Sequence, residues 1–189
     1  MTRQLGLISR GPDDTKRLAA TVGEALRAGD VVALTGELGA GKTCFVQGAA
    51  RALGVTERVT SPSFVLRRQY EGRFPILHLD VYRLETLQDV VELGYEDALD
   101  RAHITFIEWG DAMSPLLPPE HLEVEFRLPR PPDPAQPDHD TDERLVRVRA
   151  RGDDWLRRMA GLAVDLQPWR AEGSGQTPTG SDALRAEEG

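Results

Sequence analysis

The feature that most constrains the fold of this chain is the sequence Gly-Glu-Leu-Gly-Ala-Gly-Lys-Thr at residues 36–43. It fits the phosphate-binding loop pattern G-x-x-x-x-G-K-[ST]. Before it, Asp30–Thr35 is an apolar, β-branched run with the length of a buried strand. After it, Cys44–Leu53 can continue as a helix, and Gly54 is a good helix stop. A strand, a glycine-rich loop and a helix in this order predict a site for a nucleoside triphosphate.

Each fixed position of this loop has a chemical task. Successive backbone amides curl around the β-phosphate, and glycines let the backbone approach it closely. Lys42 is expected to bridge the β- and γ-phosphate oxygens, and the Thr43 hydroxyl to ligate Mg²⁺. A plain glycine-rich turn before a buried helix is the alternative, but it would leave the lysine charge at a helix N-terminus, where cations are disfavoured. The predicted nucleotide-binding residues are Gly36, Glu37, Leu38, Gly39, Ala40, Gly41, Lys42, Thr43 and Cys44, the last with an inert thiol.

Two acidic residues stand where predicted strands end. Asp80 follows Phe74–Leu79, and Glu108 follows His103–Ile107. Ligands of open α/β sheets bind beyond the carboxyl ends of the strands, so both acids are expected to converge on the loop. Glu108 is the first choice for Mg²⁺, because its strand is the more uniformly apolar and therefore central; either acid could bind the metal while the other orients the attacking water. The predicted catalytic residues are Lys42, Asp80 and Glu108, and the predicted metal ligands are Thr43, Glu108 and Asp80.

The segment around Asp80 is more polar than the end of a strand requires. Alternation places His78, Asp80 and Tyr82 on one face of the strand. Arg83 is expected to stabilise phosphate charge or to contact a partner, with an ordinary surface arginine as the alternative.

Two further features border the predicted pocket. Thr60–Ser63 lies between the loop helix and the next strand, where a nucleotide-sensing switch often sits, although a plain Ser-Pro turn explains it equally well. Trp109 follows Glu108, and packing is the first expectation for a tryptophan at the end of a strand; it could also wall the pocket or face a partner.

Length and pattern indicate one domain of the α/β class. The chain has 189 residues, 40% of them hydrophobic, which is enough for one substantial core. We predict a P-loop NTPase-like three-layer fold over residues 1–165, with a mixed sheet that has a parallel core and antiparallel edge strands, and a disordered tail over residues 166–189. Further strands are predicted at Leu5–Ser9, Phe64–Tyr70, Glu120–Leu128 and Arg144–Ala150. Further helices are predicted at residues 13–28, Thr86–Leu93, Asp97–Arg101 and Asp153–Ala163, and an exposed loop at Pro129–Asp142.

Charge limits the class of partner. Lysine and arginine number 23 and aspartate and glutamate 31, giving a net charge of −8, so the chain is a poor candidate for holding RNA or DNA by phosphate neutralisation alone. The one cysteine allows no internal disulfide, no apolar run is long enough to span a bilayer, and the N-terminus has no secretory signal pattern. We expect a cytoplasmic protein without a membrane or DNA partner, whose contact with RNA, if any, depends on another protein.

The nucleotide is expected to be ATP. GTPases usually read guanine with an Asn-Lys-x-Asp motif, and the chain contains no asparagine. Together with the loop, the segments Thr-Ser-Pro-Ser-Phe at 60–64, His-Leu-Asp-Val-Tyr-Arg-Leu at 78–84, Glu-Leu-Gly at 92–94 and Ile-Glu-Trp at 107–109 resemble the TsaE (YjeE) family of small bacterial ATPases. The resemblance covers about residues 9–150 in the same order, and the loop combined with H-x-D-x-Y-R is highly specific.

The resemblance implies a function. It implies Mg²⁺·ATP binding, slow intrinsic hydrolysis, and action with the TsaD–TsaB pair, which transfers a threonylcarbamoyl group to adenosine 37 of tRNA; tRNA is then met indirectly, through the complex. It also implies that Ser9, at the start of the segment 9–15, lies near the adenine and that Arg144 closes over it. Cys44 stands where the family commonly has threonine or serine, and Pro129–Asp142 is longer than usual.

Two other functions remain open on the sequence alone. One is a nucleotide-gated binding module in which ATP orders a docking surface and hydrolysis is incidental. The other is a phosphotransferase that acts on a small metabolite, although no acceptor-site signature of such a kinase is evident.

Overall fold

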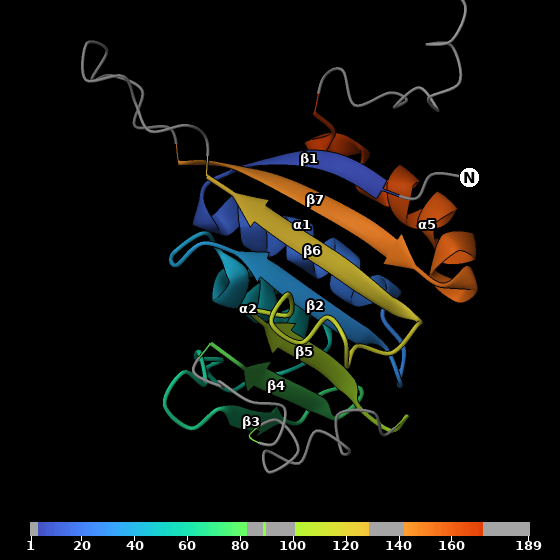
Figure 1. The fold of residues 1–189 in the computed structure, drawn as a ribbon. Helices are drawn as coiled ribbons and strands as arrows, with labels where there is room; N and C mark the ends of the chain where they lie inside the picture. Colours follow the sequence, from blue (N-terminus) through green and yellow to red (C-terminus); the bar gives the residue numbers. More distant parts are fainter. Residues whose placement is uncertain (1–3, 83–88, 90–100, 129–141, 172–189) are drawn as a thin grey trace, which may run out of the picture.

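The structure is a computed structural model of the chain, and it describes residues 4–82, 89, 101–128 and 142–171 (Figure 1). The described strands form one sheet in the order β1-β7-β6-β2-β5-β4-β3. Their bounds are β1 Gln4–Arg10, β2 Val31–Gly36, β3 Arg67–Tyr70, β4 Ile76–Asp80, β5 Ile104–Glu108, β6 His121–Arg127 and β7 Glu143–Arg151.

The sheet is mixed, as predicted. β6, β2, β5 and β4 run parallel to their neighbours in the middle, while β3 at one edge and β7 and β1 at the other pair antiparallel. β2, β4 and β5 are apolar along most of their length because both of their faces are covered. β5 lies between β2 and β4, so the strand that ends at Glu108 is central, and its carboxyl end stands beside that of β2.

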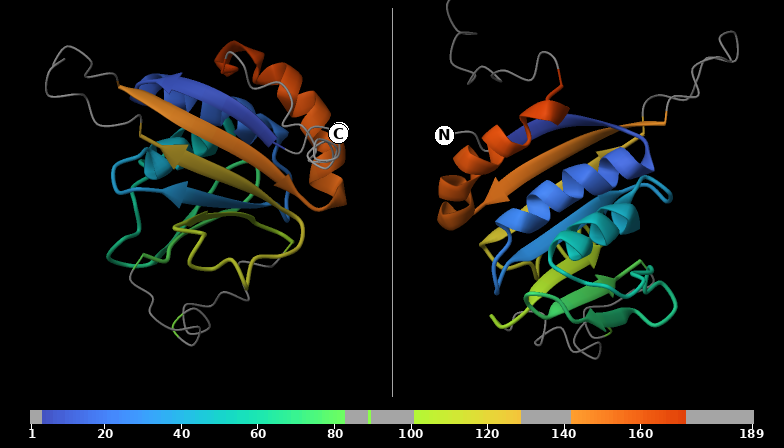
Figure 2. Two further views of the ribbon diagram at one scale, coloured as in Figure 1. Left: turned by 45° about the horizontal axis from the view of Figure 1, so that its top comes forward. Right: turned by 180° about the vertical axis from the view of Figure 1, so that it is seen from behind.

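The helices in the described residues cover one face of this sheet (Figure 2). They are α1 Pro12–Ala25, α2 Lys42–Ala52, α5 Asp153–Asp165 and the short 3₁₀ helix η1 Gln167–Trp169. Their apolar sides and the strands form the main core, in which Phe45 of α2 meets Phe126 of β6 edge-on at 5.9 Å between ring centroids. On the other face, a smaller apolar cluster joins Leu77, Leu79 and Ile107 to Met113 in the loop after β5.

Several element boundaries differ from the prediction for local reasons. The strand expected from Phe64 begins only at Arg67, because the amides of Val65 and Leu66 donate to the Pro62 carbonyl in a tight turn and Leu66 has a φ of 62°. The first helix ends at Ala25, three residues before the predicted end, where the chain turns extended at Leu26.

The C-terminal boundary also differs. Leu166 is fully buried, Trp169 packs against the core, and the Ala171 amide donates to the Gly6 carbonyl of β1. The packed domain therefore continues to Ala171, beyond the predicted boundary at residue 165. The predicted helices Thr86–Leu93 and Asp97–Arg101 lie outside the described residues except for Asp89 and Arg101. The Pro129–Asp142 loop lies outside them except for Asp142, and so do residues 172–189 of the tail.

The first amides of α5 are bonded by a residue that is distant in the sequence. The Glu120 carboxylate, just before β6, accepts hydrogen bonds from the amides of Asp153 and Asp154 at 2.8 and 3.1 Å. A carboxylate at a helix N-terminus satisfies free amides and complements the helix dipole. Asp153 therefore begins the helix without capping it, and the contact ties α5 to the start of β6.

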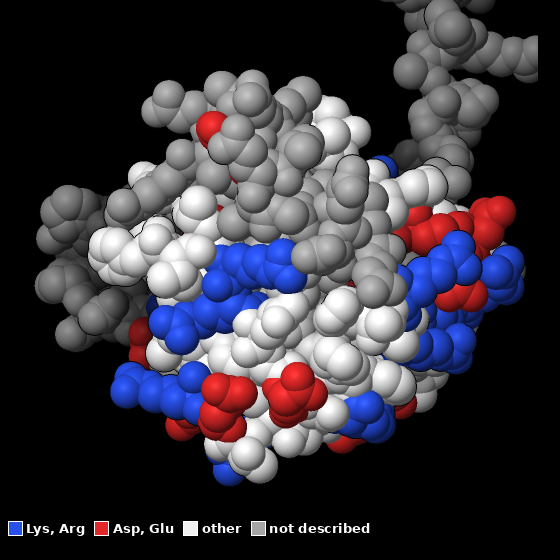
Figure 3. Space-filling view, turned by 90° about the horizontal axis from the view of Figure 1, so that it is seen from below, with Lys and Arg blue, Asp and Glu red and all other residues white. Residues whose placement is uncertain are grey.

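The edge of the sheet at β3 is charged. Arg67 and Arg68 begin this short strand, and the view from this side shows basic side chains gathered in a band across the surface, bordered by acidic ones (Figure 3). Charged side chains on a short edge strand discourage pairing with the edge of another sheet.

Candidate functional site

The glycine-rich loop connects β2 directly to α2. Gly36 has a φ of 130° and Gly41 a φ of 120°, conformations that other residues adopt rarely. A Cβ on Gly36 would also collide with the Phe126 carbonyl oxygen of β6. The loop therefore curls tightly at the carboxyl end of β2, and it leaves the first amides of α2 without side-chain caps.

Lys42 folds back over this loop. Its ammonium donates to the carbonyl oxygens of Gly36 at 2.7 Å and Glu37 at 2.9 Å, and it lies 3.7 Å from the centroid of the Trp109 ring. Burial lowers the pKa of Lys42, while the negative charges of Glu108, Asp80 and the nearby Asp111 act in the opposite direction. The ammonium thus contacts neutral carbonyls and an aromatic ring, with acidic groups near but not hydrogen-bonded to it.

Glu108 is the acid directly opposite the start of α2. Its carboxylate accepts the Thr43 hydroxyl hydrogen bond, with oxygen separations of 2.7 and 3.0 Å to Oε1 and Oε2. His78 Nε2 of β4 lies 2.9 Å from Oε1. Glu108 is 3% exposed, so among the described residues its carboxylate is stabilised by hydrogen bonds with Thr43 and His78 in place of water.

Asp80 stands beside Glu108 on the neighbouring parallel strand, where the two are partners in the register. Its carboxylate accepts hydrogen bonds from Ser61 at 3.0 Å, Ser63 at 2.7 Å and the Tyr82 amide at 3.1 Å. The segment interpreted as a candidate switch is therefore attached to the predicted catalytic acid through two hydroxyl groups.

These groups line one hollow of about 360 Å³ at the carboxyl ends of β2, β4 and β5. Tyr82 and Trp109 stack beside it with ring centroids 4.6 Å apart, and Trp109 turns the chain sharply with a φ of 62°. The remaining lining residues come from the loop, α2, the candidate switch and the ends of β4 and β5: Leu38, Gly39, Gly41, Lys42, Thr43, Cys44, Ser61, Ser63, Asp80 and Glu108. The structure thus brings all of the predicted catalytic and metal-binding residues together.

The residues predicted to lie on the adenine side come together less fully. Ser9 and Arg144 are register partners on β1 and β7, but Ser9 is buried and its hydroxyl is bonded to Thr15 and the Gly11 carbonyl. The Arg144 guanidinium is 3.7 Å from Asp142. Ser9 therefore shapes the start of α1, and Arg144 is not among the residues that line the hollow.

Cys44 lines the hollow. Its thiol donates to the Pro12 carbonyl at 3.2 Å. Burial raises the pKa of this thiol, a shift that the nearby Lys16 and Arg144 charges oppose and Asp13 reinforces. This agrees with the prediction of an inert thiol, because a raised pKa reduces the reactive thiolate form.

Sequence reasoning missed two contacts of the site. It placed His78 on the same face as Asp80 but gave it no role, and it treated Trp109 as packing before function. The pairing of His78 with Glu108 depends on β4 lying beside β5, which no local pattern specifies. Arg83, predicted to contact phosphates or a partner, lies outside the described residues.

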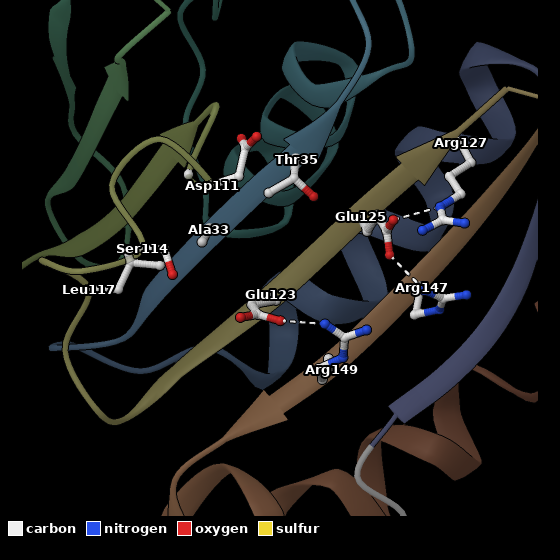
Figure 4. A pocket seen from close by; sticks show the side chains of 11 residues that line it. Ala33, Thr35, Asp111, Ser114, Leu117, Glu123, Glu125, Arg127, Arg147 and Arg149 are labelled. Atoms are coloured by element: carbon white, nitrogen blue, oxygen red, sulfur yellow. Dashed lines mark hydrogen bonds and ion pairs between the residues drawn. The ribbon is translucent and has the colours of Figure 1, made fainter. Parts of the chain in front are cut away.

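A second hollow of about 410 Å³ lies on the face of the sheet opposite the helices (Figure 4). Its wall is an ion-pair ladder across β6 and β7, in which Glu125 contacts Arg127 and Arg147, and Glu123 contacts Arg149 and Arg151. The described residues that line it include no glycine-rich loop and no helix N-terminus, and its arginines contact the glutamates. This hollow is therefore the weaker candidate for a phosphate site, although it is the larger.

The described residues contain no group of three or more His, Cys, Asp or Glu side chains placed to hold a metal ion by themselves. None of the helices in this part of the chain has both the length and the apolar character needed to cross a membrane.

The fold and the position of the site define a class, the P-loop-like α/β domains. The sequence profile of "Threonylcarbamoyl adenosine biosynthesis protein TsaE" matches residues 9–131, and the chain belongs to this family. Proteins of that name from Treponema pallidum and Bacillus subtilis are 41% and 36% identical over 121 and 123 residues; the matches cover 64% and 65% of this chain, and 90% and 77% of those proteins. The crystal structure of B. subtilis YdiB superposes with a TM-score of 0.66 at 30% identity, covering 87% of this chain and 97% of that one.

Proposed function

We propose that this TsaE-family protein is a Mg²⁺-dependent ATPase that supports turnover of the TsaD–TsaB pair in tRNA threonylcarbamoyladenosine biosynthesis. One observation carries the proposal: a buried lysine and a buried glutamate face one hollow, and each contacts only uncharged partners or an imidazole among the described residues. A site with unpaired charges of both signs suits an anion and a cation bound together, as in a metal–triphosphate complex.

The donor set fits Mg²⁺. This ion prefers oxygen ligands and keeps several waters, so it is held by one or two protein groups plus phosphates and not by a cage of side chains. Thr43 and Glu108 would hold it, with Asp80 adjacent, and the absence of a three-residue cluster among the described residues agrees with that mode. When bound, the ion neutralises phosphate charge and aligns the transferred group.

The residues of the chain have separate tasks in this proposal. The amides of residues 38–43 hold the β-phosphate, and Lys42 moves from the Gly36 and Glu37 carbonyls to the phosphates. Asp80 would orient a water molecule, or would transmit the presence of nucleotide through its hydrogen bonds from Ser61 and Ser63. ATP is favoured over GTP because the chain lacks the asparagine of the guanine-reading motif.

The partner assignment rests on the family. The chemistry of tRNA modification is assigned to TsaD, and the ATP cycle of this chain would support repeated turnover of the TsaD–TsaB pair. The chain's net charge of −8 agrees with tRNA being met through that complex.

Phosphate release tests the proposal. We expect slow Mg²⁺-dependent ATP hydrolysis by the protein alone and a faster rate when the TsaD–TsaB pair is added. A pull-down with that pair, with and without ATP, tests the association separately. No hydrolysis in either condition, with intact folding, would reject the ATPase role.

The nucleotide-gated module is the second candidate, and the hydrogen bonds from Ser61 and Ser63 to Asp80 are the observation in its favour. Glu108→Ala separates the two. If this variant binds ATP and partners, does not hydrolyse, and still supports normal tRNA modification, then gating is the function. If modification stops, hydrolysis is required. Appearance of phosphate on a metabolite would instead indicate a phosphotransferase.

A further inference from the structure

His78 is a fully buried polar side chain in the middle of the sheet. It lies on β4, and its ring is on the face of the sheet that meets the main core. Ile76, two residues earlier, is on the same face, and Phe106 of β5 is the register partner of His78. A polar ring in apolar surroundings lowers stability unless its hydrogen bonds are made. If this position only filled space in the core, an aliphatic side chain would stabilise the fold more than a histidine.

The ring uses only one of its two nitrogens. Nε2 is 2.9 Å from Glu108 Oε1, whereas Nδ1 is buried and has no hydrogen-bond partner among the described residues. An ionised carboxylate only accepts hydrogen bonds, so this pairing assigns the proton to Nε2. The unsatisfied Nδ1 is a cost of keeping histidine here, and the bond to Glu108 is the feature that a leucine or an asparagine would not reproduce.

The histidine is itself held in place. The Tyr70 ring lies 6.3 Å away, centroid to centroid, and the Tyr70 hydroxyl exchanges hydrogen bonds with the backbone of Thr60. Glu108 forms hydrogen bonds with two elements, with His78 on β4 and with Thr43 on α2. Two attachments at one carboxylate fix its rotation as well as its position.

We propose that His78 is a positioning residue, which orients the Glu108 carboxylate so that it and the Thr43 hydroxyl present one preformed site to Mg²⁺. The inference rests on the proposed function and adds to it a group that does not touch metal or nucleotide. Partners of this kind, which hold metal-binding side chains in place, change metal affinity by about 10- to 100-fold when removed.

Three substitutions test the role of the bond. His78→Gln carries an amide nitrogen the same number of bonds from the backbone as Nε2, so it keeps the donor. His78→Asn has a donor that is too short to reach, and His78→Leu has none. The measurement is the Mg²⁺ concentration that half-saturates binding of a fluorescent, non-hydrolysable ATP analogue, with thermal unfolding of each ligand-free variant as the fold control.

We expect His78→Leu and His78→Asn to need about 10-fold more Mg²⁺, and His78→Gln to stay within about threefold of the wild type. Analogue binding in EDTA should be the same for all four proteins. If the Leu and Asn variants fold and match the wild type, or if Gln loses as much as they do, the bond does not position Glu108. If His78→Leu fails to fold, the Gln and Asn pair still decides.

The same titration separates this inference from the proposed function. A wild-type protein that binds the analogue without any response to Mg²⁺ would overturn both. A wild-type response that all three variants retain would overturn only the role of His78.

Discussion

The hollow beside the glycine-rich loop and the hollow beside the β6–β7 ion pairs are of similar size and both are lined by charged groups, but their charges have different partners. On the face of the sheet opposite the helices, Glu123 and Glu125 each contact two arginines, so the charges compensate one another. At the carboxyl ends of the parallel strands, Glu108 contacts a hydroxyl and an imidazole, and Lys42 contacts carbonyls. Compensated charge supports the fold, whereas uncompensated charge is available to a ligand.

The difference follows from strand direction. β6 and β7 are antiparallel neighbours with Glu123 opposite Arg149 and Glu125 opposite Arg147, so alternate residues form cross-strand pairs on a solvated face. β2, β4 and β5 are parallel, and their ends meet a loop and a helix N-terminus instead of complementary side chains. The comparison predicts that substitutions in one hollow change nucleotide chemistry and substitutions in the other change stability.

The largest effect is expected from Lys42→Ala. Loss of the cation that is proposed to contact the phosphates should weaken ATP binding by about 100-fold or more, because charge-assisted hydrogen bonds contribute roughly 1.5–3 kcal/mol each. Equilibrium titration with a fluorescent ATP analogue measures this. Arg149→Ala is the matched control, since it removes a cation from the other hollow and should leave the affinity unchanged. Equal losses in both variants would end the distinction between the hollows.

Glu108→Gln comes next. The amide oxygen can still accept from Thr43 and His78, so the free energy of unfolding should change by no more than about 1 kcal/mol. The ATP hydrolysis rate should fall by about 100-fold or more, because the charged group that is proposed to hold Mg²⁺ at the reacting centre is lost. Phosphate release and denaturant unfolding on the same preparation provide both readouts. A large loss of stability with normal hydrolysis would show that Glu108 is a structural acid.

Glu123→Gln should show the reverse pattern. Its carboxylate bonds Arg149 and Arg151 at 2.9–3.1 Å, but these side chains are 31% and 48% exposed, so solvent screens the pairs. We expect a loss of about 1 kcal/mol in the free energy of unfolding and no change in ATP affinity. Urea denaturation measures the former. An altered affinity would show that the ladder communicates with the nucleotide site.

The smallest effect concerns pH. Burial raises the pKa of Glu123, but hydrogen bonds and charge from Arg151 and Arg149 outweigh it and hold the pKa below the usual glutamate value. A lowered folded-state pKa contributes stability that is present above the unfolded-state pKa and is lost as the pH falls through the folded-state value. The stability advantage of wild type over Glu123→Gln should therefore shrink in that acidic range. An advantage that stays constant would exclude the ion pairs as its source.

Features that depend on residues close together in the sequence could be predicted, whereas features that depend on residues far apart in the sequence could not. The glycine loop, its flanking strand and helix, and the acids at the ends of β4 and β5 come from patterns within about ten residues, and the structure brings them together. The predicted start of the edge strand β3 at Phe64 is wrong, because the turn that begins at Pro62 continues past Phe64. The Glu120 contact with α5 and the packing of residues 166–171 join segments far apart in sequence, so no local rule predicted them.

Local sequence is enough to place a loop with one lysine and one threonine at the start of a helix, because the spacing of glycines restricts the backbone to few conformations. The partners of the charged side chains depend on how the strands pack together. The tertiary structure placed His78 beside Glu108 and set Glu123 opposite Arg149, since strand order and register choose among side chains that the sequence leaves equivalent. Those choices keep one set of charges free for a ligand and use the other to hold the sheet.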